Sequence, residues 1–378
     1  MVATGGDEAG WKACTSWSPE VLATSAPTVL RLIEAGHDPV VVDDFSRGTT
    51  AAVSRVEELT GRHVPVHAYD VADIDMLERL FDAERFDAVV HLAGVRTAHT
   101  SVARPLHCYE TNLTTTFTLL RCMAWYGVPR LVLSSSGRVY DAVDAPAHED
   151  SPLAPIAPLG RAHLMNEQVL RDVAGAAEPS LRVGVLRCAT VVGPDPSGRL
   201  GDDLGGTTRG LLHAITQVAQ GRRDHLDVFG GDYPTPDGTA VRDYVHVTDV
   251  AAAHVAALEA LDDVGRPLST WNVGSGRPTS VLSLVGTFEA ATGRTLPYRV
   301  LPRRPGDAAV SYLDVSRAGE ELGWTATRGL PEICTDHWRW QRRNPEGYPL
   351  AATPETPWRG GVGHRLRLLQ GAENGPFW

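Results

Sequence analysis

Residues 28–43 read Thr-Val-Leu-Arg-Leu-Ile-Glu-Ala-Gly-His-Asp-Pro-Val-Val-Val-Asp, and this stretch decides the fold class. Its first half, residues 28–35, has apolar side chains at helical spacing. Its second half, residues 38–43, contains the short apolar run of a buried strand. A helix that leads directly into a buried strand is part of a βαβ unit, so the stretch predicts a parallel sheet covered by helices.

The same alternation continues along the first half of the chain. Strand-like runs occur at residues 88–92, 130–133 and 182–186, and residues 75–81 again have helical spacing. The sequence therefore predicts an α/β fold, a doubly wound parallel sheet with a smaller C-terminal α/β substrate-binding region.

The amino-acid composition changes after residue 187, because residues 193–208 are rich in Gly, Pro and Asp. We expect a first domain over residues 1–188, with residues 240–260 returning to it. Residues 189–350 are expected to form the second region. Residues 351–378 show little periodicity and are interpreted as an extended tail.

Composition excludes several classes of function. The formal net charge of -11 over 378 residues argues against a surface that binds nucleic acid or anionic lipid. The sequence shows no membrane-spanning run and no signal peptide, so we expect a cytoplasmic protein. The 5 cysteines are scattered without a CxxC pair, which predicts neither disulfides nor a metal site.

The N-terminal glycines do not form an ordinary phosphate-binding turn. Thr4-Gly5-Gly6 follows a very short apolar start, but the acids Asp7 and Glu8 come next, where phosphate would lie. The next helix is expected to begin near Pro27, which suits a first helical turn. We interpret residues 7–25 as a remodelled loop that does not hold a pyrophosphate in the usual way, with Trp11 and Trp17 as candidates to fill that space.

The most specific block of the sequence is residues 217–249, which includes Val241-Arg242-Asp243-Tyr244-Val245-His246-Val247, and a second block reads Arg303-Arg304-Pro305-Gly306-Asp307. Through these blocks, and from Ala26 to Leu350 overall, the chain resembles the UDP-glucose 4-epimerases, an extended branch of the short-chain dehydrogenase/reductase family with a Rossmann-like domain. The resemblance implies a nucleotide sugar as ligand, UDP-linked, and makes the chain a nucleotide-sugar-binding epimerase homologue.

The resemblance assigns the uridine diphosphate to residues matching Phe229, Arg242, Arg304 and Asp307. The chemistry of these residue types agrees. An arginine fork suits a diphosphate, an aromatic ring can cover a base, and an aspartate accepts from ribose hydroxyls.

The resemblance implies the cofactor-binding residues more weakly than the nucleotide-sugar-binding residues. Residues that resemble the family's cofactor contacts are Asp43, Asp70, Val71, Ala93 and Gly94. The resemblance implies NAD as cofactor, whereas the altered glycine turn argues against it.

The catalytic helix departs from the family pattern. These epimerases use a tyrosine base four residues before a lysine, a spacing that places both on one helical face. Leu159 occupies the tyrosine position and His163 the lysine position, while the family's serine remains as Ser136. Leucine has no proton to exchange, so the sequence predicts that hydride-transfer chemistry is lost and that Ser136 and His163 are the remaining catalytic candidates.

The sugar end of the pocket is also changed. Thr190 stands where an asparagine is expected, Arg209-Gly210 replaces another asparagine pair, and Arg96 replaces a lysine. His99 departs from the family pattern as well. We therefore include Thr190, Arg96 and His99 among the predicted substrate-binding residues.

Three functions remain open at this point. One is a repurposed non-redox enzyme that acts on a sugar nucleotide. The second is a pseudoenzyme that binds ligand or an active partner, and the third is an NAD-dependent 4-epimerase with an unusual base. Family members dimerise through helices that match residues 105–126 and 160–173, which implies a homodimer or a heterodimer with an active relative.

Overall fold

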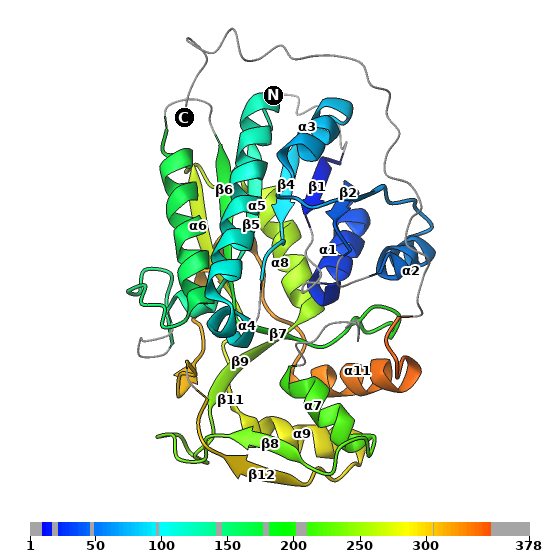
Figure 1. Ribbon diagram of the computed structural model, residues 1–378, viewed down its shortest axis with the longest axis vertical. Helices are drawn as coiled ribbons and strands as arrows, with labels where there is room; N and C mark the ends of the chain where they lie inside the picture. Colours follow the sequence, from blue (N-terminus) through cyan, green and yellow to red (C-terminus); the bar gives the residue numbers. More distant parts are fainter. Residues whose placement is uncertain are drawn as a thin grey trace, which may run out of the picture.

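The computed structural model describes residues 10–16, 22–45, 49–95, 98–140, 146–176, 181–201, 210–304 and 306–348. Its main element is a seven-stranded sheet in the order β10-β6-β5-β4-β1-β2-β3 (Figure 1). The paired strands all run parallel, which confirms the predicted α/β class. The strands are β1 (Lys12–Ser16), β2 (Asp38–Asp43), β3 (Val66–Ala68), β4 (Ala88–His91), β5 (Arg130–Ser136), β6 (Arg182–Cys188) and β10 (Leu268–Val273).

Helices cover both faces of this sheet (Figure 1). One face packs against α1 (Leu22–Glu34), α2 (Ala51–Thr60) and α8 (Val247–Ala260). The other face packs against α3 (Ile74–Ala83), α5 (Pro105–Tyr126) and α6 (Pro158–Ala174). Along β2, Val41 belongs to the first core and its neighbours Val40 and Val42 to the second, because successive strand side chains point to opposite faces. This two-sided burial explains the unbroken apolar run in the sequence.

The smaller region lies beyond the carboxyl ends of the strands (Figure 1). Its sheets contain β7 (Thr190–Val192), β9 (Val241–His246), β11 (Pro278–Ser280) and β13 (Val310–Ser311), and separately β8 (Leu226–Phe229) and β12 (Tyr298–Leu301). Its helices are α7 (Leu211–Ala219), α9 (Val281–Thr292) and α11 (Leu330–Arg343). Two short helices, α4 (Ala98–Ala103) and α10 (Ser316–Leu322), and the 3-10 turn η2 (Gly137–Val139) complete the description.

The first strand differs from the sequence-based expectation. β1 lies at residues 12–16, inside the stretch interpreted as a remodelled loop, and pairs with β2 and β4. Ala13 and Cys14 are fully buried, but such small side chains make a weak hydrophobic pattern. The glycines Gly5 and Gly6 precede this strand and lie outside the described residues, as do Trp17 and the tail from residue 351.

The first helix also begins earlier than expected. α1 starts at Leu22 and contains Pro27 in its interior, not in its first turn. A proline there removes one helical hydrogen bond and is unfavourable by about 3 kcal/mol. Burial of Val29 and Leu32 at 0% exposure compensates, since apolar side chains of this size contribute about 1.5–3 kcal/mol each.

No helix among the described residues is long and apolar enough to cross a membrane. The cysteines are all buried and free. Within the described ranges, no cluster of three or more His, Cys, Asp or Glu side chains is arranged to hold a metal ion.

A buried histidine in the smaller region makes stability depend on pH. Burial, with His213 nearby, lowers the pKa of His337 to about 3. The unfolded chain therefore takes up a proton near pH 6.5, whereas the folded chain does not until about pH 3. We expect this group to remove about 1.4 kcal/mol of stability per pH unit as pH falls from 6.5 towards 3.

The test is the His337→Gln variant, followed by urea unfolding at pH 7.5 and pH 5. The variant is expected to lose about 2 kcal/mol less stability than the wild type between these values. Asp43, whose pKa burial raises to about 7, acts in the opposite direction and is common to both proteins. The control is His63→Gln, because that side chain is 83% exposed. Equal pH slopes in the wild type and the His337 variant would contradict the assignment.

Candidate nucleotide-sugar site

Four predicted ligand-binding residues meet in the smaller region. Phe229 ends β8, Arg242 lies on β9, and Arg304 and Asp307 follow β12. The guanidinium carbon of Arg304 lies 3.5 Å from the centroid of the Phe229 ring. A guanidinium nitrogen of Arg242 lies 3.9 Å from a carboxylate oxygen of Asp307. The structure thus brings together residues that are far apart in the sequence.

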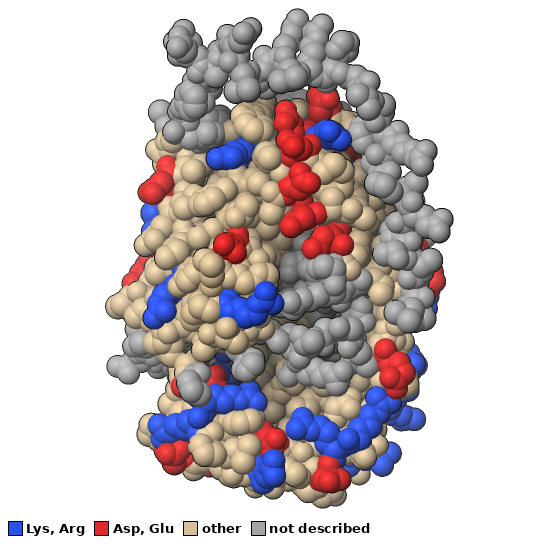
Figure 2. All heavy atoms as spheres, viewed as in Figure 1, with Lys and Arg blue, Asp and Glu red and all other residues tan. Residues whose placement is uncertain are grey.

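The charge of Arg242 is costly in this position. Burial lowers the pKa of its guanidinium, Asp307 opposes that change, and Arg138 from η2 adds like-charge repulsion. Its Nη1 donates to the carbonyl of Val241 at 2.8 Å. Arg242 and Arg138 bring two positive charges to this position, and the nearby Asp307 carboxylate lies 3.9 Å from Arg242, beyond hydrogen-bond distance. An added anion is therefore favoured, so the arrangement suits a phosphate group. Figure 2 shows arginine side chains gathered over this smaller region, with acidic side chains over the larger one.

Asp43 is the clearest feature of the predicted cofactor side. It lies at the end of β2 with 0% exposure, and one carboxylate oxygen accepts from the backbone N–H of Phe45 at 2.9 Å. The other oxygen, Oδ2, is buried without a partner among the described residues. An unpartnered acceptor in a buried position is suited to a ligand hydroxyl.

The other predicted cofactor residues lie at the ends of neighbouring strands. Asp70 is exposed and accepts from the backbone N–H of Ala72, and the carbonyl of Val71 accepts from Thr118. Ala93 and Gly94 follow β4. Gly94 has φ +138°, and a Cβ there would lie 2.8 Å from the Asn112 side chain, so only glycine fits.

The predicted catalytic residues lie where β5 and α6 come together. The Oγ of Ser136 accepts from the backbone N–H of Arg138 at 3.3 Å. Gly160 packs directly on the Arg138 carbonyl, which brings the start of α6 beside η2. Leu159 is 2% exposed and His163 is also buried, one helical turn further along.

Leu159 is part of an apolar cluster. Its neighbours there are Val95, Cys108 and Ala162, with Tyr109 at the margin. A leucine packed this way can neither accept nor donate a proton. Ser136 and His163, by contrast, are predicted catalytic residues that carry an exchangeable proton.

The structure describes only some of the remaining predicted residues. Thr190 is exposed at the start of β7 and pairs with Tyr244 of β9. Arg96 and Arg209 lie outside the described residues. His99 belongs to α4, but its side chain is outside the description.

Sequence reasoning missed a buried ion pair beside this site. Arg187 and Glu167 are each 2% exposed in their side chains and bond through two nitrogens of Arg187. Arg187 also donates to the Tyr140 hydroxyl at 2.6 Å and to the carbonyl of Glu149. Ser135 donates to Glu167. The network ties β5, β6 and α6 together next to Ser136; no signal in a single sequence pairs these residues.

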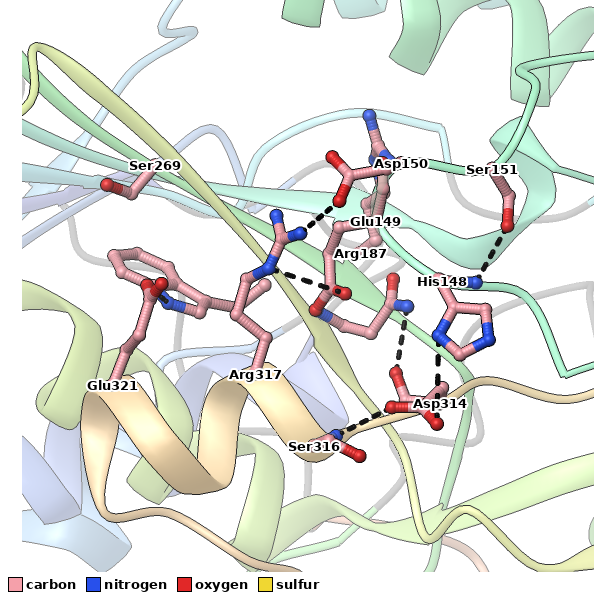
Figure 3. Close-up of polar contacts among 12 residues, drawn as sticks. His148, Glu149, Asp150, Ser151, Arg187, Ser269, Asp314, Ser316, Arg317 and Glu321 are labelled. Carbon is pink, nitrogen blue, oxygen red and sulfur yellow. Dashed lines mark hydrogen bonds and ion pairs between the residues drawn. The ribbon is translucent and has the colours of Figure 1, made fainter.

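A cavity of about 480 Å³ lies near this network, with His148, Asp150, Asp314 and Arg317 among its lining (Figure 3). Most of its charged side chains already pair with one another. Arg317 contacts Asp150 and lies 3.7 Å from Glu149, and His148 lies 3.7 Å from Asp314. We therefore place the candidate site at Arg242 and Phe229, where the positive charge of Arg242 is less well compensated.

Comparison with known proteins identifies close relatives. The model of the "NAD dependent epimerase/dehydratase family" matches residues 27–274. UDP-glucose 4-epimerase 2 of Arabidopsis thaliana is 43% identical over 325 residues, covering 85% of this chain and 93% of that protein. The Bacillus subtilis UDP-glucose 4-epimerase is 43% identical over 326 residues, covering 86% and 95%.

Solved structures agree with these matches. The Bifidobacterium longum UDP-glucose 4-epimerase in complex with NAD+ and UDP superposes with a TM-score of 0.84 at 36% identity, covering 89% of this chain and 100% of that one. The Stenotrophomonas maltophila enzyme with bound NAD and formylated UDP-arabinopyranose gives 0.83 at 37% identity, covering 88% and 98%.

Proposed function

The chain belongs to the NAD dependent epimerase/dehydratase family, and we propose that it binds a UDP-linked sugar in the cleft at Arg242. The observation that carries this proposal is the assembly of Phe229, Arg242, Arg304 and Asp307 from three separate segments. The arginines supply charge for the diphosphate, Phe229 covers the base, and Asp307 accepts from the ribose.

The finer proposal concerns the reaction. The relatives are UDP-glucose 4-epimerases, whereas Leu159 here leaves no proton acceptor on that turn of α6. We propose that this chain does not carry out 4-epimerisation at an appreciable rate. Non-redox proton transfer by Ser136 and His163 on the bound sugar nucleotide is the activity that the remaining groups support.

NAD is bound in the solved structures of the Bifidobacterium and Stenotrophomonas enzymes, and one end of the site in this chain fits it. The unpartnered Oδ2 of Asp43 suits a ribose hydroxyl. The two solved structures and the Asp43 side chain support NAD as a ligand, so the doubt drawn from the glycine turn is not confirmed. Residues 17–21, which connect β1 and α1, read Trp-Ser-Pro-Glu-Val and contain no glycine for close approach to a pyrophosphate. We therefore propose weak NAD binding through the adenosine end and assign no reaction step to it.

A second candidate is a catalytically inactive partner protein, favoured by one observation. Large apolar side chains are exposed on adjacent helices, namely Leu106, Phe117 and Trp125 on α5 and Met165 on α6. A stable monomer would normally cover such a face. We propose a dimer through α5 and α6, either with a second copy or with an active relative.

A native mass spectrum of the purified chain tests these proposals, because it reports both mass and bound ligands. We expect a dimer that retains UDP-glucose when this compound is added, without stoichiometric NAD. NAD bound together with the sugar nucleotide would favour an ordinary 4-epimerase with an unusual base. Binding of neither would overturn the proposed function. Where turnover is found, His163→Ala is expected to abolish it, with the exposed His148→Ala as control.

A further inference from the structure

The ring of Tyr233 is held in one position in the loop after β8. Gly230 has φ +81°, and a Cβ at that residue would collide with the ring, so the ring lies directly on the Gly230 backbone. The Arg303 guanidinium lies 4.3 Å from the ring centroid and bonds to Asp232 at 2.8 Å. The backbone N–H of Tyr233 donates to the carbonyl of Gly238 at 3.0 Å. These contacts fix the direction of the hydroxyl.

That hydroxyl has no hydrogen-bond partner among the described residues, although Tyr233 is 6% exposed and the oxygen itself is buried. A buried polar group without a partner is unfavourable and needs an explanation. The charges that act on the hydroxyl include Asp307 and Arg242, two of the four residues assigned to the nucleotide. Burial raises the pKa of Tyr233, so the group keeps its proton at neutral pH and is available as a donor.

The ligand-binding residues leave room for such a donor. Arg242 and Asp307 are 3.9 Å apart, which is longer than a hydrogen bond between them. The Tyr233 ring itself contacts Gly230 and Arg303, which are the chain neighbours of the predicted ligand-binding residues Phe229 and Arg304. Arginine supplies charge there and aspartate accepts protons, whereas tyrosine adds a neutral donor with a fixed direction.

We propose that Tyr233 is a ligand-binding residue whose hydroxyl donates a hydrogen bond to a ribose or diphosphate oxygen of the bound nucleotide. This inference rests on the proposed function, since it assumes that a nucleotide occupies the cleft at Arg242. It predicts that the hydroxyl contributes to affinity and contributes nothing to the stability of the ligand-free protein.

The test is Tyr233→Phe, which removes the hydroxyl and keeps the ring. We expect UDP affinity measured by calorimetry to fall about 5- to 20-fold, as for one hydrogen bond to a charged or polar ligand group. The melting temperature of the ligand-free variant is expected to equal or exceed that of the wild type. Tyr126→Phe, at the far end of α5, is the matched control and should leave UDP affinity unchanged.

Uridine as a second ligand identifies the accepting oxygen. A loss for UDP alone assigns the bond to the diphosphate, and a loss for both ligands assigns it to the ribose. Unchanged affinity for both ligands overturns the inference, and so does a lower melting temperature with unchanged affinity. A wild-type protein that binds neither ligand would overturn the proposed function itself, so the two failures are distinguishable.

Discussion

Replacing Arg242 with alanine is expected to weaken UDP binding about 100-fold, since charge-assisted hydrogen bonds to a phosphate are each worth about 1.5–3 kcal/mol. The guanidinium is largely buried, and its Nη1 donates to the carbonyl of Val241. Alanine would also leave Asp307 without its nearest counter-charge, which adds repulsion towards a diphosphate.

Isothermal calorimetry with UDP measures this effect. The matched control is Arg299→Ala, because Arg299 lies on β12 in the same region but is exposed and pairs with Asp227. The control is expected to bind UDP within about twofold of the wild type, as a surface ion pair contributes little. If the Arg242 variant were folded and also bound UDP within about threefold of the wild type, the cleft would not be the nucleotide site.

Replacing Glu167 with glutamine is expected to lower the free energy of unfolding by about 3–5 kcal/mol, because it leaves the buried Arg187 charge without its partner. Both side chains are 2% exposed, so water cannot compensate the lost interaction. Tyr140 and the Glu149 carbonyl would still accept from Arg187, but neither carries a negative charge at neutral pH. Urea unfolding of the purified variant gives the value.

Two further variants show whether the buried pair is the cause. The double variant Glu167→Met with Arg187→Met removes both charges and is expected to be more stable than Glu167→Gln alone. Asp262→Asn breaks a partly exposed pair with Arg130 and Arg182, and is expected to change stability by less than about 1 kcal/mol. A Glu167→Gln variant as stable as Asp262→Asn would show that the network does not depend on its charge.

The sequence alone determined the fold class, and it predicted which residues form the candidate nucleotide site. The residues Val40-Val41-Val42 are all apolar because helices cover β2 on both faces. Burial of this kind can be predicted from the local sequence pattern. Phe229, Arg242 and Asp307 were identified by resemblance, which depends on residue order and not on geometry. Leu159 was likewise recognised by its place four residues before His163.

Other features were decided only by the tertiary structure. β1 is built from Lys12–Ser16, whose small and polar residues carry no strong pattern until the flanking strands bury them. The ion pair between Arg187 and Glu167 joins a strand to a helix, and sequence spacing gives no information on such a contact. The missing partner of the Tyr233 hydroxyl is a property of its whole surroundings. Local pattern records which side of an element is buried, whereas the sheet order determines which distant groups meet there, and the polar chemistry of this site depends on that order.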